Sequence, residues 1–393
     1  MTDRASREFD VIAYGATGYT GRLVAQYLAG RASQEPGPVG RWAMAGRSEE
    51  KLKSVRDEVG APADTPLVVA DAEDAASLAA MAGRARVVLT TVGPYQLYGE
   101  PLLRACIEAG TDYTDLCGEP AWMARMIEAH GRAAAGSGSR VVFSSGFDSI
   151  PSDMGVWFLQ RACRERFGAP AVRASLRVVS MKGTFSGGTA ASFQETMKAA
   201  MKDPGVIGLL KDPFALCPGF EGPKQPSMSK VRVDEEAGVW LAPFVMAAIN
   251  TKTVHRSNML QGHAYTEGFA YEEMVETGPG DAARKVAEAI ASDDSMSPGK
   301  APKPGEGPTE AEREAGGYDL VIRGATAAGE VLSVRVTGDK DPGYGSTSKM
   351  ISQTALALAE DEDLPGGFHT TAMLGEALLG RLRARAGLTF EVV

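Results

Sequence analysis

Cysteine and histidine are scarce in this sequence. The 393 residues include four cysteines and four histidines. No two cysteines form a CxxC pair, and no two histidines have HxH or HxxxH spacing. A disulfide scaffold, a zinc ribbon and a metal centre are therefore not expected. Widely spaced cysteines of this kind are typical of a reduced compartment, so we predict a cytoplasmic protein.

Long apolar runs are missing as well. Residues 1–10 carry charges and lack the apolar core of a signal peptide. The longest apolar stretch, Val239–Ile249, is too short to cross a bilayer, which takes roughly 20 residues of helix. It predicts a buried strand. Contact with a membrane surface stays open, as a peripheral association at the inner face of the plasma membrane.

An excess of positive charge is also absent. Lys and Arg number 41 against 50 Asp and Glu, which gives a formal charge of −9. Nucleic acid is an improbable partner, because neutralising its phosphates takes clustered cations. The hydrophobic share of 44% and the charged share of 23% are ordinary for a folded globular chain. Glycine is the one excess, at 46 residues, and indicates many turns and close backbone approaches.

The first 150 residues alternate apolar runs with helical patterns, which predicts βαβ units and a parallel sheet. The expected strands are Phe9–Tyr14, Arg41–Ala45, Pro66–Ala70, Val87–Val92, Tyr113–Leu116 and Arg140–Ser144. The expected helices are Tyr19–Ala29, Ser48–Val59, Ala75–Ala82, Tyr98–Ala109 and Ala121–Ala135. The fold class is therefore α/β, with a Rossmann-type NADP-binding domain over residues 1–151.

After Pro151 the pattern changes. A helix near Ser152–Phe167 leads into long β-rich runs, which predict a second, α+β domain with a mainly antiparallel sheet over residues 152–346. These runs are Val172–Met181, Val231–Asn250, Ala264–Glu276 and Tyr318–Thr337. Residues 293–317 contain prolines at 298, 302, 304 and 308 and indicate a mobile surface loop. Helices near Thr347–Ala359 and Thr370–Arg385 should pack back on the first domain as a segment over 347–393.

The most informative motif follows the first strand, where three glycines recur at intervals of three. Gly15 permits a tight turn, Gly18 lets the backbone approach a pyrophosphate, and Gly21 lets the helix lie close to the strand. The helix N-terminus then presents free N–H groups to the phosphates. The predicted cofactor residues here are Gly15, Thr17, Gly18, Tyr19, Thr20 and Gly21.

The end of the second strand favours NADP over NAD. An NAD enzyme places an acidic residue there, but this chain has Gly46, Arg47 and Ser48, with Lys51 one turn on. Cations and a hydroxyl suit a 2′-phosphate. Alternatively, Arg47 is merely solvated and Ser48 caps the next helix. Asp71, after the third strand, either accepts from the adenine amino group or caps the helix that follows.

The fourth strand ends at Thr91, Val92, Gly93, Pro94 and Tyr95, which should border the nicotinamide ribose. Tyr95 and Tyr98 are the candidate catalytic residues, since a hydroxyl can polarise a carbonyl, although a packing role fits either ring. No tyrosine has a lysine four positions on, as short-chain dehydrogenases require; Tyr344, with Lys349 five positions on, comes nearest.

An acidic group surrounds the next strand ends. It consists of Asp112, Asp115, Glu119, Asp148 and Asp153. Glu119 and Asp148 are candidate substrate-binding residues, although Asp148 and Asp153 equally suit capping of the helix from Ser152. Cys117 fits a small buried residue better than a nucleophile. His255 and Arg256, expected after a strand, are further candidates for binding a carboxylate or phosphopantetheine-type group.

These segments together resemble the saccharopine-dehydrogenase-like oxidoreductases, and among them the mycobacterial trans-acting enoyl reductases. The matching segments are 14–21, 45–48, 90–95, 109–119, 145–153, 186–189, 255–258 and 372–379. Around residues 278–300 this chain is shorter than those enoyl reductases and lacks an apolar insertion that they have. The resemblance implies NADPH, a Rossmann domain, a hydrophobic or acyl small-molecule substrate and a homodimer.

Three functions follow as hypotheses. The first is NADPH-dependent reduction of a C=C bond in an enoyl or acyl lipid-type substrate. The second is saccharopine-type imine reduction or amino-acid oxidation, which needs several arginines to grip paired carboxylates. The third is a non-catalytic, NADP-binding, lipid-associated protein, because a fold alone does not fix function.

Overall fold

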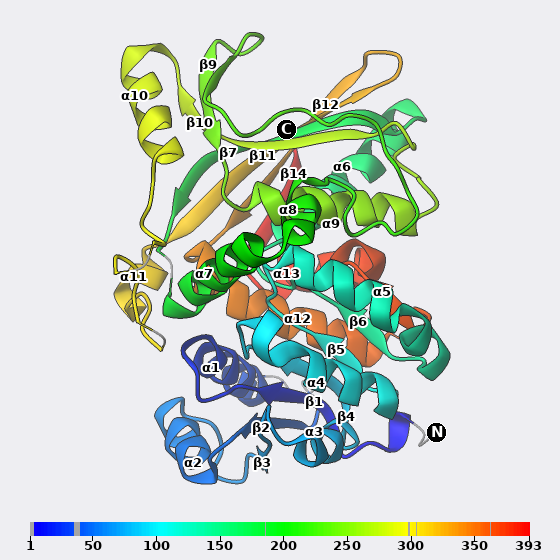
Figure 1. The fold of residues 1–393 in the computed structure, drawn as a ribbon, viewed down its shortest axis with the longest axis vertical. Helices are drawn as coiled ribbons and strands as arrows, with labels where there is room; N and C mark the ends of the chain where they lie inside the picture. The colour runs from blue at the N-terminus through cyan, green and yellow to red at the C-terminus, as the bar shows by residue number, and fades with distance from the viewer. Residues whose placement is uncertain (1–3, 35–39, 185, 298, 304, 362) are drawn as a thin grey trace.

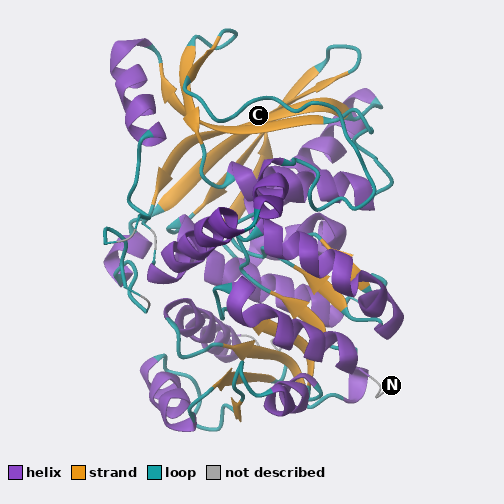
Figure 2. Ribbon diagram, viewed as in Figure 1, coloured by secondary structure: helices purple, strands orange, loops and turns teal. Residues whose placement is uncertain are grey.

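Two β-sheets, one parallel and one mixed, form the frame of the chain. The computed structural model describes residues 4–34, 40–184, 186–297, 299–303, 305–361 and 363–393. Figures 1 and 2 show the parallel sheet at the lower end and the mixed sheet at the upper end, with helices between them.

The parallel sheet has seven strands in the order β13-β6-β5-β4-β1-β2-β3. Its strands are β1 (Phe9–Tyr14), β2 (Trp42–Gly46), β3 (Leu67–Val69), β4 (Ala85–Thr90), β5 (Asp112–Thr114), β6 (Arg140–Val142) and β13 (Gly367–His369). The strand order reverses at β1, which pairs with β2 on one side and β4 on the other. Ligands of such sheets bind beyond the carboxyl ends of the strands at this reversal.

Helices alternate with these strands, as the sequence predicts. They are α1 (Tyr19–Gln34), α2 (Glu49–Glu58), α3 (Ala75–Ala82), α4 (Tyr95–Ala109) and α5 (Pro120–Ser137). A late helix, α12 (Thr347–Glu360), contacts β1, β4, β5 and α1. The side chains of Ser48 and Asp74 cap α2 and α3, which explains where these two helices begin.

The second sheet is mainly antiparallel and confirms the predicted fold class. Its order is β14-β12-β11-β7-β10-β9-β8, and among its pairs only β7 with β10 is parallel. The strands are β7 (Ala171–Lys182), β8 (Arg232–Asp234), β9 (Val239–Pro243), β10 (Ala270–Gly278), β11 (Gly317–Thr326), β12 (Val331–Gly338) and β14 (Leu388–Val392). A Cβ on Gly155 of α6 (Ile150–Phe167) would lie 2.5 Å from Ile322 Cδ1, so this helix packs closely on the sheet.

Several helices of this half differ from the prediction. They are α7 (Gly187–Lys202), α8 (Pro204–Lys211), α9 (Ala247–Leu260) and α10 (Gly280–Ala291). Helix α13 (Gly375–Arg385) matches the helix predicted near Thr370–Arg385. The strand predicted for Val239–Ile249 was wrong beyond Pro243, because Ile249 lies in α9. A helix buried on most sides cannot be told from a strand by apolar periodicity.

Short helical turns complete the chain. They are η1 (Arg4–Ser6), α11 (Glu310–Glu314), η2 (Pro342–Ser346) and η3 (Thr371–Leu374). Helix α11 interrupts the predicted loop at 293–317 and begins with a capping box of Thr309 and Glu312. Pro298 and Pro304 lie outside the described residues. No described helix is both long and apolar enough to cross a membrane. The domain boundary near residue 151 stays a prediction.

Candidate functional site

The glycine turn between β1 and α1 needs glycine for measurable reasons. Gly15 has φ +89, in the region that L side chains rarely adopt. A Cβ on Gly21 would lie 2.0 Å from the Gly15 carbonyl oxygen. The Gly18 N–H donates to that same oxygen at 2.9 Å, which closes the turn. Strand, turn and helix therefore have the close packing that a dinucleotide-binding turn requires.

An open cavity of about 1040 Å³ lies at this turn, and we call it the cofactor cavity. Its lining residues are Tyr14, Gly15, Thr17, Gly18, Gly46, Arg47, Asp71, Ala72, Glu73, Thr91, Val92, Gly93 and Tyr98. It brings together most of the predicted cofactor residues. Those that do not line it are Tyr19, Thr20, Gly21, Ser48, Lys51, Pro94 and Tyr95.

The ribose end of this cavity fits a 2′-phosphate. Arg47 is exposed there and has no hydrogen bond or ion pair with any described residue, so its guanidinium is available to an anion. The Ser48 hydroxyl accepts from the Lys51 backbone N–H at 3.3 Å, as a helix cap does. These residues fit NADP: Arg47 would hold its 2′-phosphate, and the glycine turn would hold its pyrophosphate.

Asp71 and Tyr98 both line the cofactor cavity. The alternative that Asp71 caps the next helix is wrong, because Asp74 caps α3 by accepting from two backbone N–H groups. Asp71 instead accepts from the Glu73 backbone N–H at 3.1 Å. Tyr98 lines this cavity with Arg47 and does not line the second cavity, which is described next, so the geometry gives no support to its predicted catalytic role.

A second open cavity of about 1050 Å³, the apolar cavity, adjoins the first. Thr91 and Gly93 line both cavities and mark where they meet. The other lining residues are Thr20, Tyr95, Leu116, Phe147, Asp148, Met181, Gly183, Thr184, Ser186, Gly188, Thr189, Ser192, Phe244, Val245, Met246, Pro342, Gly343, Tyr344 and Thr347. The nicotinamide end of a cofactor that enters at the glycine turn would reach this junction.

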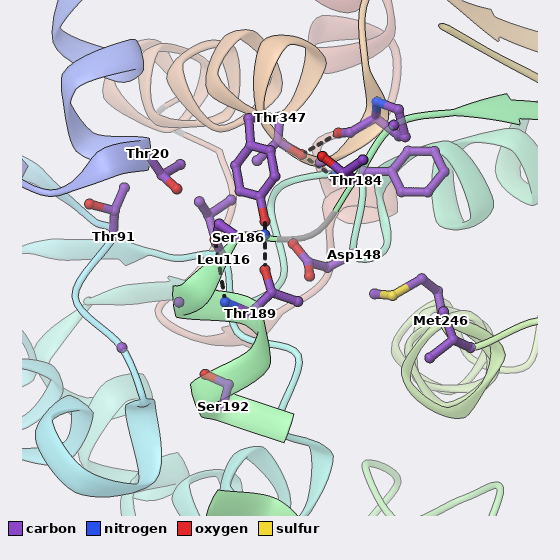
Figure 3. A pocket seen from close by; sticks show the side chains of 18 of the residues that line it. Thr20, Thr91, Leu116, Asp148, Thr184, Ser186, Thr189, Ser192, Met246 and Thr347 are labelled. Atoms are coloured by element: carbon purple, nitrogen blue, oxygen red, sulfur yellow. Dashed lines mark hydrogen bonds between the residues drawn. The ribbon is translucent and has the colours of Figure 1, made fainter. Parts of the chain in front are cut away.

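Several polar groups line the apolar cavity. Tyr344 Oη lies 2.9 Å from Thr189 Oγ1 and also accepts from the backbone N–H of Ser186. In Figure 3, Thr20 and Thr91 lie on one side of the pocket and Met246 on the other, with Asp148 between. Nine hydroxyl side chains and one carboxyl therefore line the cavity together with apolar side chains, a mixture found in many small-molecule sites.

Tyr95 lines the apolar cavity, but its hydroxyl is engaged elsewhere. It donates to the Thr90 carbonyl at 3.3 Å and accepts from the Leu116 N–H at 3.1 Å. Burial raises the pKa of this phenol well above its ordinary value. The ring also packs near Trp122, with centroids 5.8 Å apart. These contacts match the packing alternative for Tyr95 and give no support to its predicted catalytic role.

The two candidate acids have different surroundings. Glu119 is buried, and its carboxylate accepts from the backbone N–H groups of Tyr95 and Gln96, each at 2.9 Å. It therefore stabilises the start of α4 and does not line the apolar cavity. Asp148 does line it. Burial raises the pKa of Asp148 from 3.8 to about 7.

His255 and Arg256 do not follow a strand, and that prediction was wrong. Both are buried within α9, where the fold places a helix instead of the expected strand end. Arg256 donates to the carbonyls of Leu216 at 2.5 Å and Phe368 at 2.7 Å. Burial lowers the pKa of His255 to about 3. Neither residue lines the apolar cavity, so the geometry gives no support to substrate binding.

Sequence reasoning missed Tyr344, Thr189 and Phe244 as lining residues. Tyr344 lies in η2, Thr189 in the unpredicted α7, and Phe244 in the turn after β9. The available signals were the Ser186–Thr189 segment and the glycines around Tyr344, which indicate turns but no common site. Among the described residues, no group of three His, Cys, Asp or Glu side chains could hold a metal.

Comparisons with known proteins agree with this geometry. Residues 11–142 match the family model described as the saccharopine dehydrogenase NADP binding domain. A trans-acting enoyl reductase of Mycobacterium ulcerans is 40% identical over 96% of this chain and 96% of its own. A Mycobacterium tuberculosis protein that is provisionally named a trans-acting enoyl reductase is 41% identical over 98% of this chain and 97% of its own.

A solved structure shares the fold. The apo saccharopine dehydrogenase (L-Glu forming) of Saccharomyces cerevisiae superimposes with a TM-score of 0.54 at 10% identity, covering 98% of this chain and 100% of its own. So low an identity shows the fold alone. Taken with the near full-length relatives, these matches show that the chain belongs to the saccharopine-dehydrogenase-like family of oxidoreductases and that its cofactor is NADP.

Proposed function

We propose that this chain is an NADPH-dependent reductase of a carbon–carbon double bond in an apolar acyl substrate, such as the enoyl thioester of a lipid pathway. The observation that carries the proposal is the apolar cavity joined to the cofactor cavity at Thr91 and Gly93. Phe147, Phe244 and Met246 line it. Relatives named trans-acting enoyl reductases support the same reaction.

The saccharopine-type alternative has less support. Substrates with several carboxylates are usually gripped by arginine or lysine. None of the described residues that line the apolar cavity is Arg, Lys or His. A bound amino dicarboxylate would therefore lack a cationic partner there, whereas an acyl chain would bury apolar surface.

The chain's own groups suit the reduction of a thioester. NADPH, when bound, supplies the hydride. The Tyr344 hydroxyl accepts from the Ser186 N–H, and its pairing with Thr189 leaves one O–H of the two for a substrate carbonyl oxygen. Such a donor stabilises the negative charge that develops on that oxygen. The apolar wall excludes water from the reacting atoms.

A substrate panel tests the proposal. We expect NADPH oxidation with a long-chain enoyl thioester and none with saccharopine or a quinone. Met181→Arg, on the rim of the apolar cavity, should raise the KM for the thioester and leave NADPH binding unchanged. Val179→Arg is the matched control, because Val179 lies two residues earlier in β7 with the same 42% exposure and does not line the cavity. Tight NADPH binding without turnover of any substrate would favour the non-catalytic alternative.

Peripheral lipid contact belongs to the same proposal, and helix α7 supports it. Phe193, Met197 and Met201 recur every four residues and are all exposed, Met201 at 78%. Lys198 and Lys202 follow the two methionines, and Lys202 has no ion-pair partner among the described residues. An apolar stripe beside cations fits a bilayer surface with anionic headgroups.

Co-sedimentation with phosphatidylglycerol vesicles tests this surface. Met201→Glu should weaken vesicle binding several-fold, because an exposed methionine that would insert among the lipids is replaced by a charge that the anionic headgroups repel. Val331→Glu, at an exposed position on β12, is the control. Equal binding by both variants would remove α7 from the proposal.

A cytoplasmic location and a role in lipid biosynthesis are part of this proposal. A homodimer, predicted through the second sheet, is tested by light scattering.

A further inference from the structure

Four of the five carboxylates around the ends of β5 and β6 are fully engaged in holding the backbone. The group comprises Asp112, Asp115, Glu119, Asp148 and Asp153. Asp112 accepts from the Arg140 side chain at 3.0 Å and from its backbone N–H at 2.8 Å. Asp115 accepts from the backbone N–H groups of Cys117 at 3.0 Å and Ser144 at 2.9 Å. Both are structural anchors.

The next two are engaged in the same way. Glu119 caps α4 through the backbone N–H groups of Tyr95 and Gln96. Asp153 accepts from the Thr371 hydroxyl at 2.8 Å and so joins α6 to η3. None of these four carboxylates lines the apolar cavity.

Asp148 is the exception. Its side chain accepts no hydrogen bond from any other described residue, and it lines the apolar cavity. Figure 3 shows it projecting between Thr189 and Met246. The alternative that Asp148 caps the following helix was wrong, because α6 begins at Ile150 with Ser149 as its cap residue and no side-chain cap bond.

The residues on both sides of Asp148 are each held by a hydrogen bond. The Phe147 N–H donates to Thr347 Oγ1 at 2.8 Å. On the other side, the Ser149 hydroxyl donates to Asn250 Oδ1 at 3.2 Å. The Asp148 carboxyl is bonded only to its own backbone, on a loop fixed at both flanks, so its position is set while its outer oxygen stays available to a substrate, as a reacting group requires.

The surroundings of Asp148 favour its neutral, protonated form. Burial raises its pKa to about 7. The titratable groups that interact with it electrostatically are Tyr95, Asp115, Cys117 and Tyr344. None of them carries positive charge, and no Lys, Arg or His among the described residues lines the cavity. No cation therefore stabilises the carboxylate, the effect of burial exceeds that of the hydrogen bond from its own backbone, and a protonated carboxyl is a proton donor.

We propose that Asp148 is the general acid that delivers a proton to the substrate carbon next to the thioester carbonyl. The inference rests on the proposed function. NADPH, when bound, would supply the hydride for the new C–H bond at the β-carbon and leave as NADP⁺. The electron pair of the C=C bond shifts to join the α-carbon to the carbonyl carbon, and the carbonyl pair moves to oxygen, which gives an enolate. As the carbonyl re-forms, the Asp148 O–H bond breaks and a C–H bond forms at the α-carbon. The carboxylate left behind takes a proton from water.

The two tyrosines of the cavity suit this step less well. The Tyr95 hydroxyl already donates to the Thr90 carbonyl. The Tyr344 hydroxyl is paired with Thr189 Oγ1 and suits the carbonyl oxygen better than the carbon beside it. Burial raises the pKa of both phenols above their ordinary value, which makes them weaker acids than Asp148.

The first test is Asp148→Asn, which keeps the shape and removes the acid. We expect kcat for the enoyl thioester to fall by a factor on the order of 10² to 10⁴. The NADPH Kd should stay within about twofold, since Asp148 does not line the cofactor cavity. Asp64→Asn is the control and should match the wild type, because Asp64 is an exposed acid that lines neither cavity. A wild-type rate in Asp148→Asn overturns the proposal.

A second readout separates this inference from the proposed function. The wild-type kcat/KM should fall as pH rises through about 7, where Asp148 loses its proton, and that decline should vanish in Asp148→Asn. In apo protein labelled with ¹³C-aspartate, the carboxyl signal missing from Asp148→Asn should titrate near 7. A wild type that reduces no enoyl thioester overturns the proposed function. Titration of that signal near 4 overturns the role of Asp148 whatever the substrate.

Discussion

The ring of Tyr344 meets the ring of Tyr19 edge to face, with the ring centroids 5.1 Å apart. Tyr19 begins α1 directly after the glycine turn, whereas Tyr344 lines the apolar cavity. The Tyr19 hydroxyl also donates to the Pro308 carbonyl and accepts from Arg313 Nη1 at 3.1 Å. Tyr19 therefore joins the cofactor-binding turn to the second half of the chain.

Tyr19→Phe should destabilise the fold modestly. It removes two partly buried hydrogen bonds, to the Pro308 carbonyl and to Arg313, while the ring contact with Tyr344 remains. We expect the free energy of unfolding to fall by about 1 kcal/mol in urea denaturation. Tyr98→Phe is the control, because the Tyr98 hydroxyl has no partner among the described residues. Equal stability of the two variants would mean that the Tyr19 hydroxyl does not join the two halves.

Arg47→Ala should remove the preference for NADPH. Arg47 lines the cofactor cavity without an internal partner, so a 2′-phosphate would be its main interaction. We expect the NADPH Kd to rise about 10- to 100-fold and the NADH Kd to stay constant. Fluorescence titration measures both. Lys53→Ala, on α2 but outside the cavity lining, should change neither affinity. Equal affinity of the wild type for the two cofactors would contradict the assignment.

The parallel sheet could be predicted from sequence because its signals are local. Gly15 and Gly21 are six positions apart, and the turn that they form lies between one strand and one helix. Ser48 caps the helix that follows it directly. Strand–turn–helix units repeat in this part of the chain, so each prediction supported the next.

The apolar cavity could not be predicted in the same way. Asp148, Thr189, Phe244 and Tyr344 come from four separate loops or helix starts and meet only through packing. Their neighbours in sequence give no sign of this meeting. Arg256 shows the converse error, because a cation in an unrecognised helix was taken for a ligand-binding group, whereas its two terminal nitrogens donate to backbone carbonyls.

Gly21→Ala should disrupt the cofactor turn. The added Cβ would lie 2.0 Å from the Gly15 carbonyl oxygen, so α1 would have to move away from β1. We expect a loss of at least about 2 kcal/mol in unfolding free energy, together with loss of NADPH binding. Gly30→Ala, in the same helix, meets no described atom within 4 Å. It should be neutral or stabilise the protein by up to about 1 kcal/mol. Normal NADPH binding by Gly21→Ala would contradict the close packing of the turn.

Glu119→Gln distinguishes the capping role of Glu119 from the predicted role in substrate binding. The carboxylate accepts two backbone N–H groups, from Tyr95 and Gln96, at the start of α4. Glutamine offers one oxygen and turns an N–H group toward the other donor, so we expect urea denaturation to show a loss of about 2 kcal/mol. The KM for the thioester should stay unchanged in the folded variant. Glu100→Gln, an exposed position on the same helix, is the control. A raised KM with unchanged stability would instead assign Glu119 to substrate binding. If Glu119 only caps α4, Glu119→Gln should change KM no more than the control Glu100→Gln does.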